Sequence, residues 1–189
     1  MTQERNLLVA AKGQEKLKEW LSAICAGEIV LTAGAAQARR KASGDVFSLA
    51  LINAPLQDES GLELAIDLAR NTTAAVVLLV NTGMASLIAD TAMSAGVLIV
   101  TKPVNQLLFE QTIKVGISCR NRLLMYKEQA ERLQTRYEEL KVIDRAKCLL
   151  IEHMRITEEE AHRVLEKEAM DSRMPRVRVA RKVLEKFEL

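Results

Sequence analysis

The sequence predicts an α/β protein: a doubly wound parallel sheet of (βα)5 order, followed by a coiled-coil helix and a small three-helix all-α domain. The first observation is a series of short, largely apolar runs, as expected of buried parallel strands. These runs are Leu7–Ala11, Glu28–Ala33, Phe47–Asn53, Ala74–Asn81 and Val97–Thr101. The second is that a segment with helical length and spacing follows each run. These segments are Glu15–Ala26, Ala35–Ala42, Gly61–Arg70, Met84–Ala95 and Asn105–Gly116. Any ligand crevice is then expected at the carboxyl ends of the strands.

Composition supports a folded, two-unit protein. The chain has 189 residues, of which 49% are hydrophobic and 28% are charged, a balance typical of folded rather than disordered proteins. Cys25, Cys119 and Cys148 lie far apart without CxxC spacing, so we expect no disulfide framework and no zinc site. The polar start, Met1–Asn6, and the lack of a membrane-length apolar run predict a cytoplasmic protein without a signal peptide or membrane partner.

A heptad pattern begins at Cys119, where apolar residues recur at alternating spacings of four and three. Charged residues fill the other faces of this predicted helix, as in a coiled coil. We predict that two chains pair along this side into a homodimer; the alternative is one amphipathic helix that packs on its own chain. The residues expected to pair, called the heptad stripe below, are Leu123, Tyr126, Ala130, Leu133, Tyr137 and Leu140. Asp144 breaks the pattern, so packing should change near Val142.

Two further helices are predicted near the end of the chain. Thr157 and Glu160 have the spacing of a capping box, in which each side chain satisfies the other's backbone N–H. Pro175 suits the first turn of a last helix, where its missing N–H costs nothing. The expected helices are Glu158–Met170 and Pro175–Phe187. The predicted domains are an α/β domain at 1–117, a coiled-coil linker at 118–141 and a helical domain at 142–189.

Residues 5–117, with Lys102-Pro103 directly after the fifth predicted strand, resemble the receiver domain of two-component response regulators. In that family an acidic pair after strand one and an aspartate ending strand three bind Mg²⁺ and accept phosphate. Here Ala10-Ala11 and Asn53 stand at these places, with Asn53 located by counting back from Gly61. Thr82 is slightly displaced from the family's hydroxyl position. Lys102 remains, either with a signalling role or as a solvated or locally paired lysine.

These replacements predict a receiver-like domain without phosphate-accepting chemistry. Mg²⁺ needs carboxylate oxygens, and phosphoryl transfer relies on that metal, so we expect neither metal binding nor phosphorylation. Asp58 and Glu59 follow the third strand, but adjacent loop carboxylates point apart and are usually just solvated. No nucleotide-binding or nucleophile motif is present, and His153 and His162 lie in the tail. We therefore expect no enzyme activity and no cofactor.

Beyond Leu140 the chain resembles the ANTAR domain of antitermination regulators in the AmiR and NasT group. The resemblance rests on the stretches Val142–Met154, Thr157–Ala161 and Glu168–Arg173. It implies a dimer that binds RNA hairpins in pairs and thereby prevents a transcription terminator from forming. It places Ala146 and Lys147 in the Ala-Lys motif, Ala161 in the second helix and Ala169-Met170 at that helix's end. Ala161 and Ala169 are also explained as sites of close helix packing.

Basic residues gather at the end of the chain although the net charge is only +2. From Arg173 onward they are Arg173, Arg176, Arg178, Arg181, Lys182 and Lys186, against Glu185 and Glu188. Such a run is usually a solvated face, but the ANTAR resemblance favours RNA binding, since Lys and Arg pair with phosphates and Arg also stacks on bases. The RNA-binding candidates are Ala146, Lys147, Arg173, Arg176 and Lys182. Phe187 is expected to be a core anchor.

The leading hypothesis is an RNA-binding transcription antitermination regulator that acts on nascent-transcript hairpins. Its activity would be set without phosphorylation, by assembly or by a regulatory protein or ligand that docks on the receiver-like domain. A second hypothesis is a non-catalytic adaptor that sequesters a protein partner through the coiled coil and the inert receiver. A third, a DNA-binding response regulator, lacks a recognisable helix-turn-helix spacing.

Overall fold

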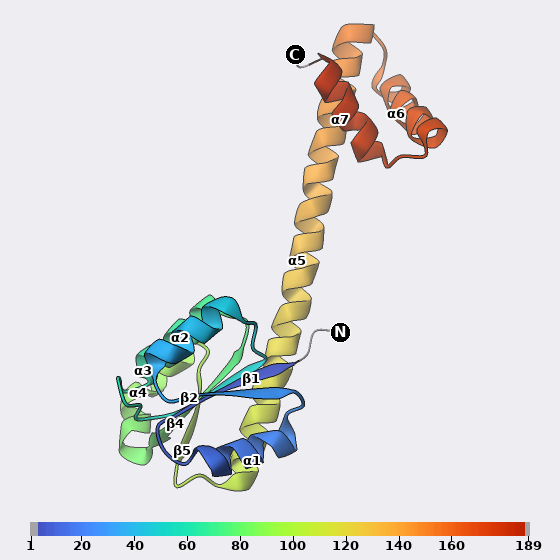
Figure 1. Cartoon of the computed structure of the whole chain (residues 1–189). Coiled ribbons are helices and arrows are strands. Elements are labelled where there is room, and N and C mark those ends of the chain that lie inside the picture. The colour runs from blue at the N-terminus through green and yellow to red at the C-terminus, as the bar shows by residue number, and fades with distance from the viewer. Residues whose placement is uncertain (1–3, 188–189) are drawn as a thin grey trace. The chain divides into compact units, whose positions relative to one another are not determined.

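The computed structural model describes residues 4–187 and divides the chain between Met125 and Tyr126 into two compact units. The N-terminal unit is α/β and the C-terminal unit is helical (Figure 1). None of the helices within residues 4–187 combines the length and the apolar character that crossing a membrane requires.

A five-stranded parallel sheet forms the centre of the N-terminal unit. Its strands are β1 (Arg5–Ala10), β2 (Glu28–Thr32), β3 (Leu49–Asn53), β4 (Ala75–Asn81) and β5 (Leu98–Lys102). They are ordered β2-β1-β3-β4-β5, and every neighbouring pair is parallel. This is a doubly wound order in which the chain reverses direction across the sheet between β1 and β3. The predicted α/β fold is therefore confirmed.

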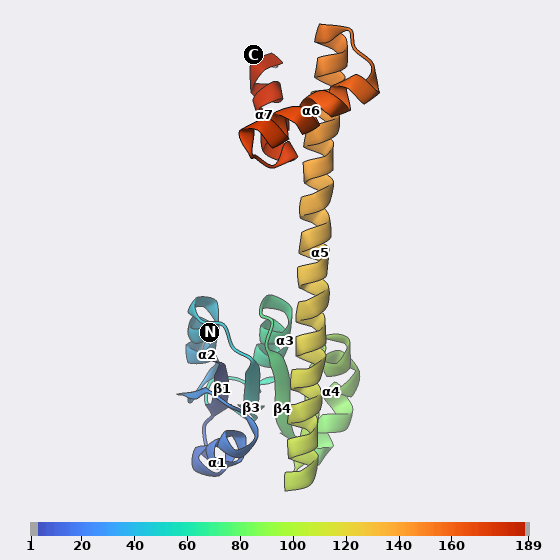
Figure 2. The same ribbon diagram turned by 90° about the vertical axis from the view of Figure 1, so that its right-hand side faces the viewer.

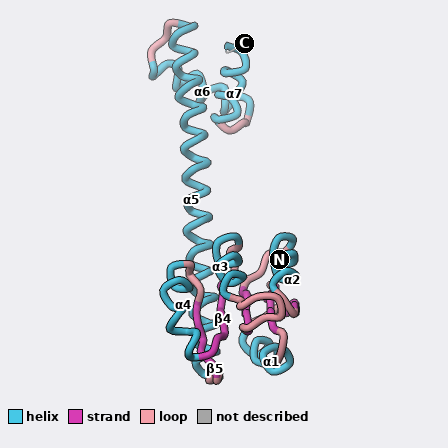
Figure 3. Tube along the Cα trace, turned by 90° about the vertical axis from the view of Figure 1, so that its left-hand side faces the viewer, coloured by secondary structure: helices cyan, strands magenta, loops and turns pink. Residues whose placement is uncertain are grey.

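Helices cover both faces of the sheet (Figures 2 and 3). Successive strand residues point to opposite faces, and because the residues on both faces are apolar, each face forms a core with helices. Leu7 and Val9 face a core formed with α2 (Ala35–Gly44), α3 (Leu62–Asn71) and α4 (Thr82–Ser94). Leu8 and Ala10 face the other core, formed with α1 (Gln14–Ile24) and the start of α5 (Gln106–Met154). In that second core the rings of Trp20 on α1 and Phe109 on α5 lie 5.5 Å apart.

Helix α5 runs without interruption for 49 residues. The sequence predicts a separate helix ending at Gly116, but the backbone continues through this glycine into the heptad region. Gly116 instead allows close packing, because an added Cβ would lie 3.0 Å from Leu98 Cδ1 on β5. The expected domain limits at 117/118 and 141/142 both fall inside this helix, so no change in backbone marks them and they stay a prediction.

The middle of α5 exposes the heptad stripe. Leu123, Leu133 and Leu140 keep 68%, 59% and 58% of their surface accessible, and every residue from 125 to 141 is exposed. The alternative to pairing is that this helix packs on its own chain, and the structure does not show such packing for residues 125–141. An apolar stripe that its own chain leaves in water is the surface that a second helix would cover.

The C-terminal unit packs the end of α5 against α6 (Glu158–Ser172) and α7 (Arg176–Phe187). Small residues line this core: Ala146, Ala161 and Ala180 have no exposed surface. The predicted capping box is present, since Glu160 Oε2 accepts from Thr157 N–H at 2.8 Å and Thr157 Oγ1 accepts from Glu160 N–H at 3.3 Å. Phe187 packs against the same core, its ring stacked on His153 with centroids 4.7 Å apart.

Both turns of this unit are made by arginines. Arg155 follows α5 and Arg173 follows α6, with φ of 54° and 53°, a left-handed conformation that favours glycine. The N–H of Arg155 reaches the carbonyl of Ile151 at 3.0 Å, and that of Arg173 reaches Met170 at 3.2 Å. Helix α6 thus ends two residues later than predicted, and Pro175 precedes α7 rather than lying in its first turn.

Candidate functional site

The carboxyl ends of the strands bring the predicted receiver residues to one edge of the sheet. Ala10 at the end of β1 pairs in register with Asn53 at the end of β3, and Lys102 ends β5. Asn53 Nδ2 donates to the Lys12 carbonyl at 2.9 Å and so ties β3 to the β1–α1 loop. An ionised aspartate could not make this bond, because a carboxylate has no hydrogen to donate. Asn53 therefore acts as a donor at the position that the sequence predicts to correspond to the receiver family's phosphate acceptor.

Lys102 is locally bonded at the same edge. Its Nζ donates to the carbonyl of Ala54, and its own carbonyl accepts from Thr82 Oγ1 at 3.1 Å. Burial lowers the pKa of this lysine, since desolvation disfavours the charged form. These contacts link β5 to the residue after β3 and to the start of α4, and they match the locally paired reading of Lys102.

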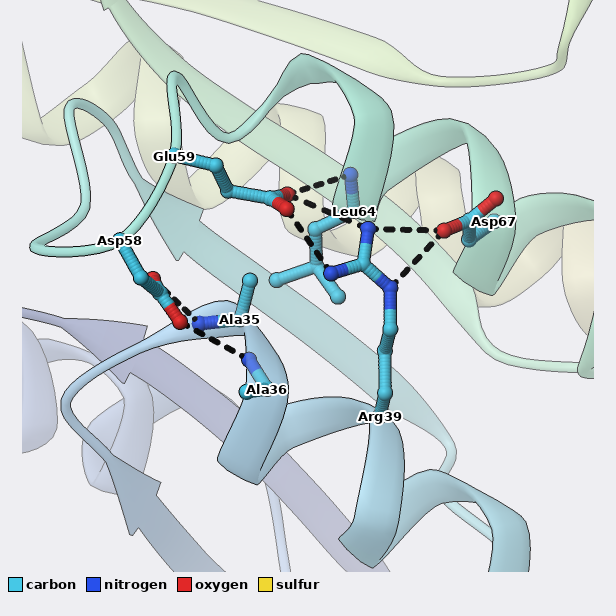
Figure 4. Close-up of polar contacts among 7 residues, drawn as sticks. All are labelled: Ala35, Ala36, Arg39, Asp58, Glu59, Leu64 and Asp67. Carbon is cyan, nitrogen blue, oxygen red and sulfur yellow. Dashed lines mark hydrogen bonds and ion pairs between the residues drawn. The ribbon is translucent and has the colours of Figure 1, made fainter.

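Asp58 and Glu59, in the loop between β3 and α3, are not simply solvated as the sequence suggests (Figure 4). Asp58 accepts from the backbone N–H groups of Ala35 at 2.8 Å and Ala36 at 3.0 Å, at the N-terminus of α2. The bond from Ala36 and then that from Ala35 lower the pKa of the Asp58 carboxyl. Gly34 permits this approach, because a Cβ there would lie 2.8 Å from the Asp58 carboxylate. Asp58 is thus exposed, as is usual for a loop carboxylate, and it is also bonded to the N-terminus of α2.

Glu59 joins an ion-pair network instead. Its Oε2 lies 2.8 Å from Arg39 Nη1 on α2, and its Oε1 accepts from Leu64 N–H at 2.9 Å. Arg39 also contacts Asp67 on α3 at 2.8 Å. As expected, the two neighbouring carboxylates point to different partners (Figure 4). Within residues 4–187 no group of three or more His, Cys, Asp or Glu side chains is arranged to hold a metal.

In the C-terminal unit, charge is divided between the outer faces of α6 and α7. The α6 sequence EEEAHRVLEKEAMDS is rich in carboxylates, and Glu158, Glu159 and Glu166 lie together on its surface. The α7 sequence RVRVARKVLEKF has a single acidic residue, Glu185. Arg178, Arg181 and Lys182, three and four residues apart, share a hollow beside Pro175 and Glu185. We call Arg178, Arg181 and Lys182 the α7 basic face.

The α7 basic face is available to a ligand. Its three side chains are exposed, and within the described residues none has an ion-pair or hydrogen-bond partner. The inner side of the same helix, Val179 and Ala180, is buried in the core, which fixes the outward direction of the cations. Cations held on a helix without carboxylate partners suit phosphate groups.

Comparison with known proteins decides the identity of this part of the chain. Residues 131–184 match the family model of the ANTAR domain. The C-terminal unit carries an ANTAR domain. The match includes α5 from Glu131 onward, all of α6, and α7 as far as Leu184. The α7 basic face is therefore a surface of the ANTAR domain itself.

Solved structures show that the N-terminal unit has the receiver fold. A CheY-like response regulator receiver domain from Methanospirillum hungatei JF-1 is 25% identical, with a TM-score of 0.55 over 64% of this chain and 98% of that chain. A signal receiver domain of an HD domain-containing protein from Pseudomonas fluorescens Pf-5 is 20% identical, with a TM-score of 0.53 over 65% and 95%. A structure described as adenylate cyclase from Rhodopirellula baltica is 20% identical, with a TM-score of 0.60 over 68% and 98%. No curated protein matches the sequence significantly.

The structure places the predicted RNA-binding residues of the ANTAR domain in different environments. Ala146 is fully buried, so any contribution it makes to RNA binding is through helix packing. Lys147 is only 16% exposed and contacts Asp144 at 2.9 Å and Glu158 at 3.0 Å, which raise its pKa in that order. Arg176 pairs with Glu166 at 3.1 Å. Lys182 and Arg173 are exposed, with Lys182 on the α7 basic face and Arg173 in the turn before α7.

Sequence reasoning missed the two arginines that accompany Lys182. Arg178 and Arg181 were counted in the basic tail but not selected as candidates. Their signal was present, because their spacing puts them on the helical face opposite the apolar residues Val179, Ala180 and Val183. Lys147 has one local partner, Asp144, three residues before it on α5. The pairs of Lys147 with Glu158 and of Arg176 with Glu166, in contrast, join different helices and have no local signal.

The amide at Asn53 gives a first test. We expect Asn53→Asp to lower the stability of the N-terminal unit by about 1–2 kcal/mol, because it removes a donor and places a carboxylate beside the Lys12 carbonyl. We also expect no phosphoryl adduct after incubation with acetyl phosphate and Mg²⁺, since Ala10-Ala11 offer no metal ligands. Urea unfolding measures the stability, and intact-mass spectrometry detects any adduct. Asn121→Asp, which makes the same change at an exposed position of α5, is the matched control for both. A stable adduct mapped to the strand ends, in either the variant or the native chain, would refute the second expectation.

The Asp58 carboxylate gives a pH test. Because folding lowers its pKa, its stabilising effect is complete above the unfolded value of about 3.9 and is lost as the pH falls through the lower folded value. We expect the urea midpoint of the chain to fall between pH 5 and pH 3, and Asp58→Asn to weaken this dependence by removing the titrating group. Asp90→Asn on α4, an exposed aspartate without a partner among the described residues, is the control. Equal pH dependence in both variants would contradict the role of Asp58.

Proposed function

We propose that the chain is an RNA-binding transcription antitermination regulator of the AmiR and NasT kind, which acts on hairpins in nascent transcripts. The observation that carries the proposal is the α7 basic face: three exposed cations on the outer side of an ANTAR helix, none of which pairs with a carboxylate among residues 4–187. Phosphate contacts supply much of the affinity for nucleic acid, and arginine planes also stack on bases that a hairpin loop splays out.

The candidates from the sequence keep different parts in this proposal. Arg173 and Lys182 extend or belong to the α7 basic face and contact RNA directly. Lys147 links α5 to α6 through Glu158, and Arg176 links α7 to α6 through Glu166. These two residues reach RNA only by exchanging a carboxylate for a phosphate. Ala146, Ala161 and Ala169 set how closely the helices pack.

The proposal includes regulation without phosphorylation. The strand-end edge has an amide donor at Asn53 and alanines at Ala10-Ala11, so phosphate has no acceptor and Mg²⁺ has no carboxylate ligand there. Control of RNA binding is then exerted through assembly along the heptad stripe, or through a molecule that binds the N-terminal unit. The chain performs no catalysis in this proposal.

The RNA surface is tested with matched charge removals. We expect Arg181→Ala/Lys182→Ala to weaken binding to hairpins recovered by selection from a random RNA pool about tenfold or more, since each good contact is worth about 1–3 kcal/mol. The plot of log affinity against log salt should also become less steep by about 0.7 to 1 for each lost phosphate contact. Arg163→Ala/Lys167→Ala removes the same charge from α6 and should have little effect. Equal losses in the two double variants would show a general charge effect and would remove the α7 basic face from the proposal.

A failure of the native chain to bind any selected hairpin would overturn the antitermination proposal itself. If that chain still paired through α5, the protein-sequestering adaptor would become the better account. Gel-shift titration and filter binding at several salt concentrations measure both affinity and slope. The melting temperatures of the two double variants show whether a loss of affinity comes from a lost RNA contact or from a loss of folding.

Pairing is tested on the heptad stripe. We expect Leu133→Lys/Leu140→Lys to convert a dimer into a monomer in sedimentation velocity, because two charges per chain would be buried in an apolar seam. Thr135→Lys adds charge to the opposite side of the same helix and should leave the dimer intact. A dimer that survives the double change, or a native chain that sediments as a monomer at micromolar concentration, would contradict pairing through this stripe.

A further inference from the structure

A cavity of about 160 Å³ lies in the N-terminal unit between the β3–α3 loop, the end of β4 and helix α4. Its floor is apolar: Ala54, Leu78, Val80 and Ile88 are each at most 8% exposed. Leu62 and Pro55 complete the apolar wall. An apolar cavity of about 150 Å³ accepts a molecule the size of benzene. This cavity is similar in volume but opens to solvent on the side of the exposed residues Pro55, Ser60, Asn81 and Met84. Its apolar floor therefore suits a small apolar group that enters from that side.

The mouth of the cavity is polar at two points. The side chains of Ser60 and Asn81 line it and are exposed, and among residues 4–187 neither side chain has a hydrogen-bond partner. One hydroxyl and one amide are therefore free to donate to, or accept from, a polar end of a bound molecule. No charged residue lines the cavity. A charged ligand would lose its hydration there without gaining a partner.

The cavity is separate from the degenerate phosphate position but lies next to it. Ala54, which forms part of its floor, is also the residue whose carbonyl accepts from Lys102. Met84 on α4 also lines the cavity, and this side chain is 43% exposed. A molecule in the cavity would contact the loop after β3 and the first turns of α4 at the same time.

We infer that this cavity is a binding site for a small neutral molecule of about six to eight non-hydrogen atoms, with an apolar ring or branched chain at one end and a hydroxyl or amide at the other. The apolar end occupies the floor beside Leu78 and Ile88, and the polar end meets Asn81 and Ser60. The site supplies the N-terminal unit with an input that needs neither phosphate nor metal. It goes beyond the RNA-binding function and does not depend on it.

The full-length chain with ¹³C-labelled methionine ε-methyl groups tests the inference, with benzyl alcohol as the probe. Met84 reports on the cavity, while Met93, which is 73% exposed on the same helix, and Met170, which is 77% exposed on α6, report on non-specific adsorption. We expect a saturable shift of the Met84 signal with a dissociation constant on the order of a millimolar, as a ligand of this size allows, and no saturable shift of the other two. Glycerol, which is polar along its whole length, should leave Met84 unchanged.

Two variants locate the probe. Ala54→Leu fills the floor and should abolish binding of 4-fluorobenzyl alcohol, observed through its ¹⁹F linewidth, whereas Met93→Leu should not change it. If Ala54→Leu fails to fold by circular dichroism, Met84→Trp closes the mouth from an exposed position and should have the same effect on binding. Three results would overturn the inference. The first is parallel shifts of all three methionines that do not saturate, and the second is no shift of Met84 at probe concentrations of tens of millimolar. The third is binding that persists in a folded variant whose cavity is blocked.

Discussion

Two of the three hydrophobic cores described above depend on helix α5. Near its start Phe109 and Ile113 are completely buried against the sheet, and near its end Ala146 and Leu150 are buried against α6 and α7. Between these two buried ends, every residue of the helix from 125 to 141 is exposed. An isolated helix gains little from its backbone bonds alone, so most of its stability comes from packing. The two ends are thus anchored by packing, while the middle is held by internal hydrogen bonds and by ion pairs such as Arg132 with Glu128.

Side chains at the carboxyl ends of the strands bond mainly to the protein itself. Asn53 Nδ2 donates to the Lys12 carbonyl, and Lys102 donates to the Ala54 carbonyl. Nearby, the carboxylates of Asp58 and Glu59 bind the N-terminus of α2 and Arg39. These contacts join the loop after β3 to α2 and thereby stabilise one conformation of that loop.

Much of this architecture could be predicted from local patterns, because buried strands, amphipathic helices and capping boxes leave signals within a few residues. The five strands, the Thr157–Glu160 cap and the core position of Phe187 are examples. Features that depend on distant partners could not be predicted. The sequence predicts a helix end at Gly116, whereas this glycine lets α5 approach Leu98. The partners of Asp58 lie 22 and 23 residues away in sequence. Glu158, which bonds Lys147 from the next helix, is 11 residues away, so local sequence does not distinguish the paired Lys147 from the exposed Arg178 and Arg181.

The exposed middle of α5 also has a consequence for the lifetime of the chain. A protease cleaves backbone that has left regular structure, and such opening is easiest where few buried contacts must be broken. In a single chain that place is the segment 125–141, whose residues are all exposed and which contains Arg132, Arg136 and Lys141 as cleavage positions for a trypsin-like enzyme. Pairing would bury the stripe and close this segment. Chains that have found a partner would therefore outlast those that have not, and turnover itself would remove the unassembled form.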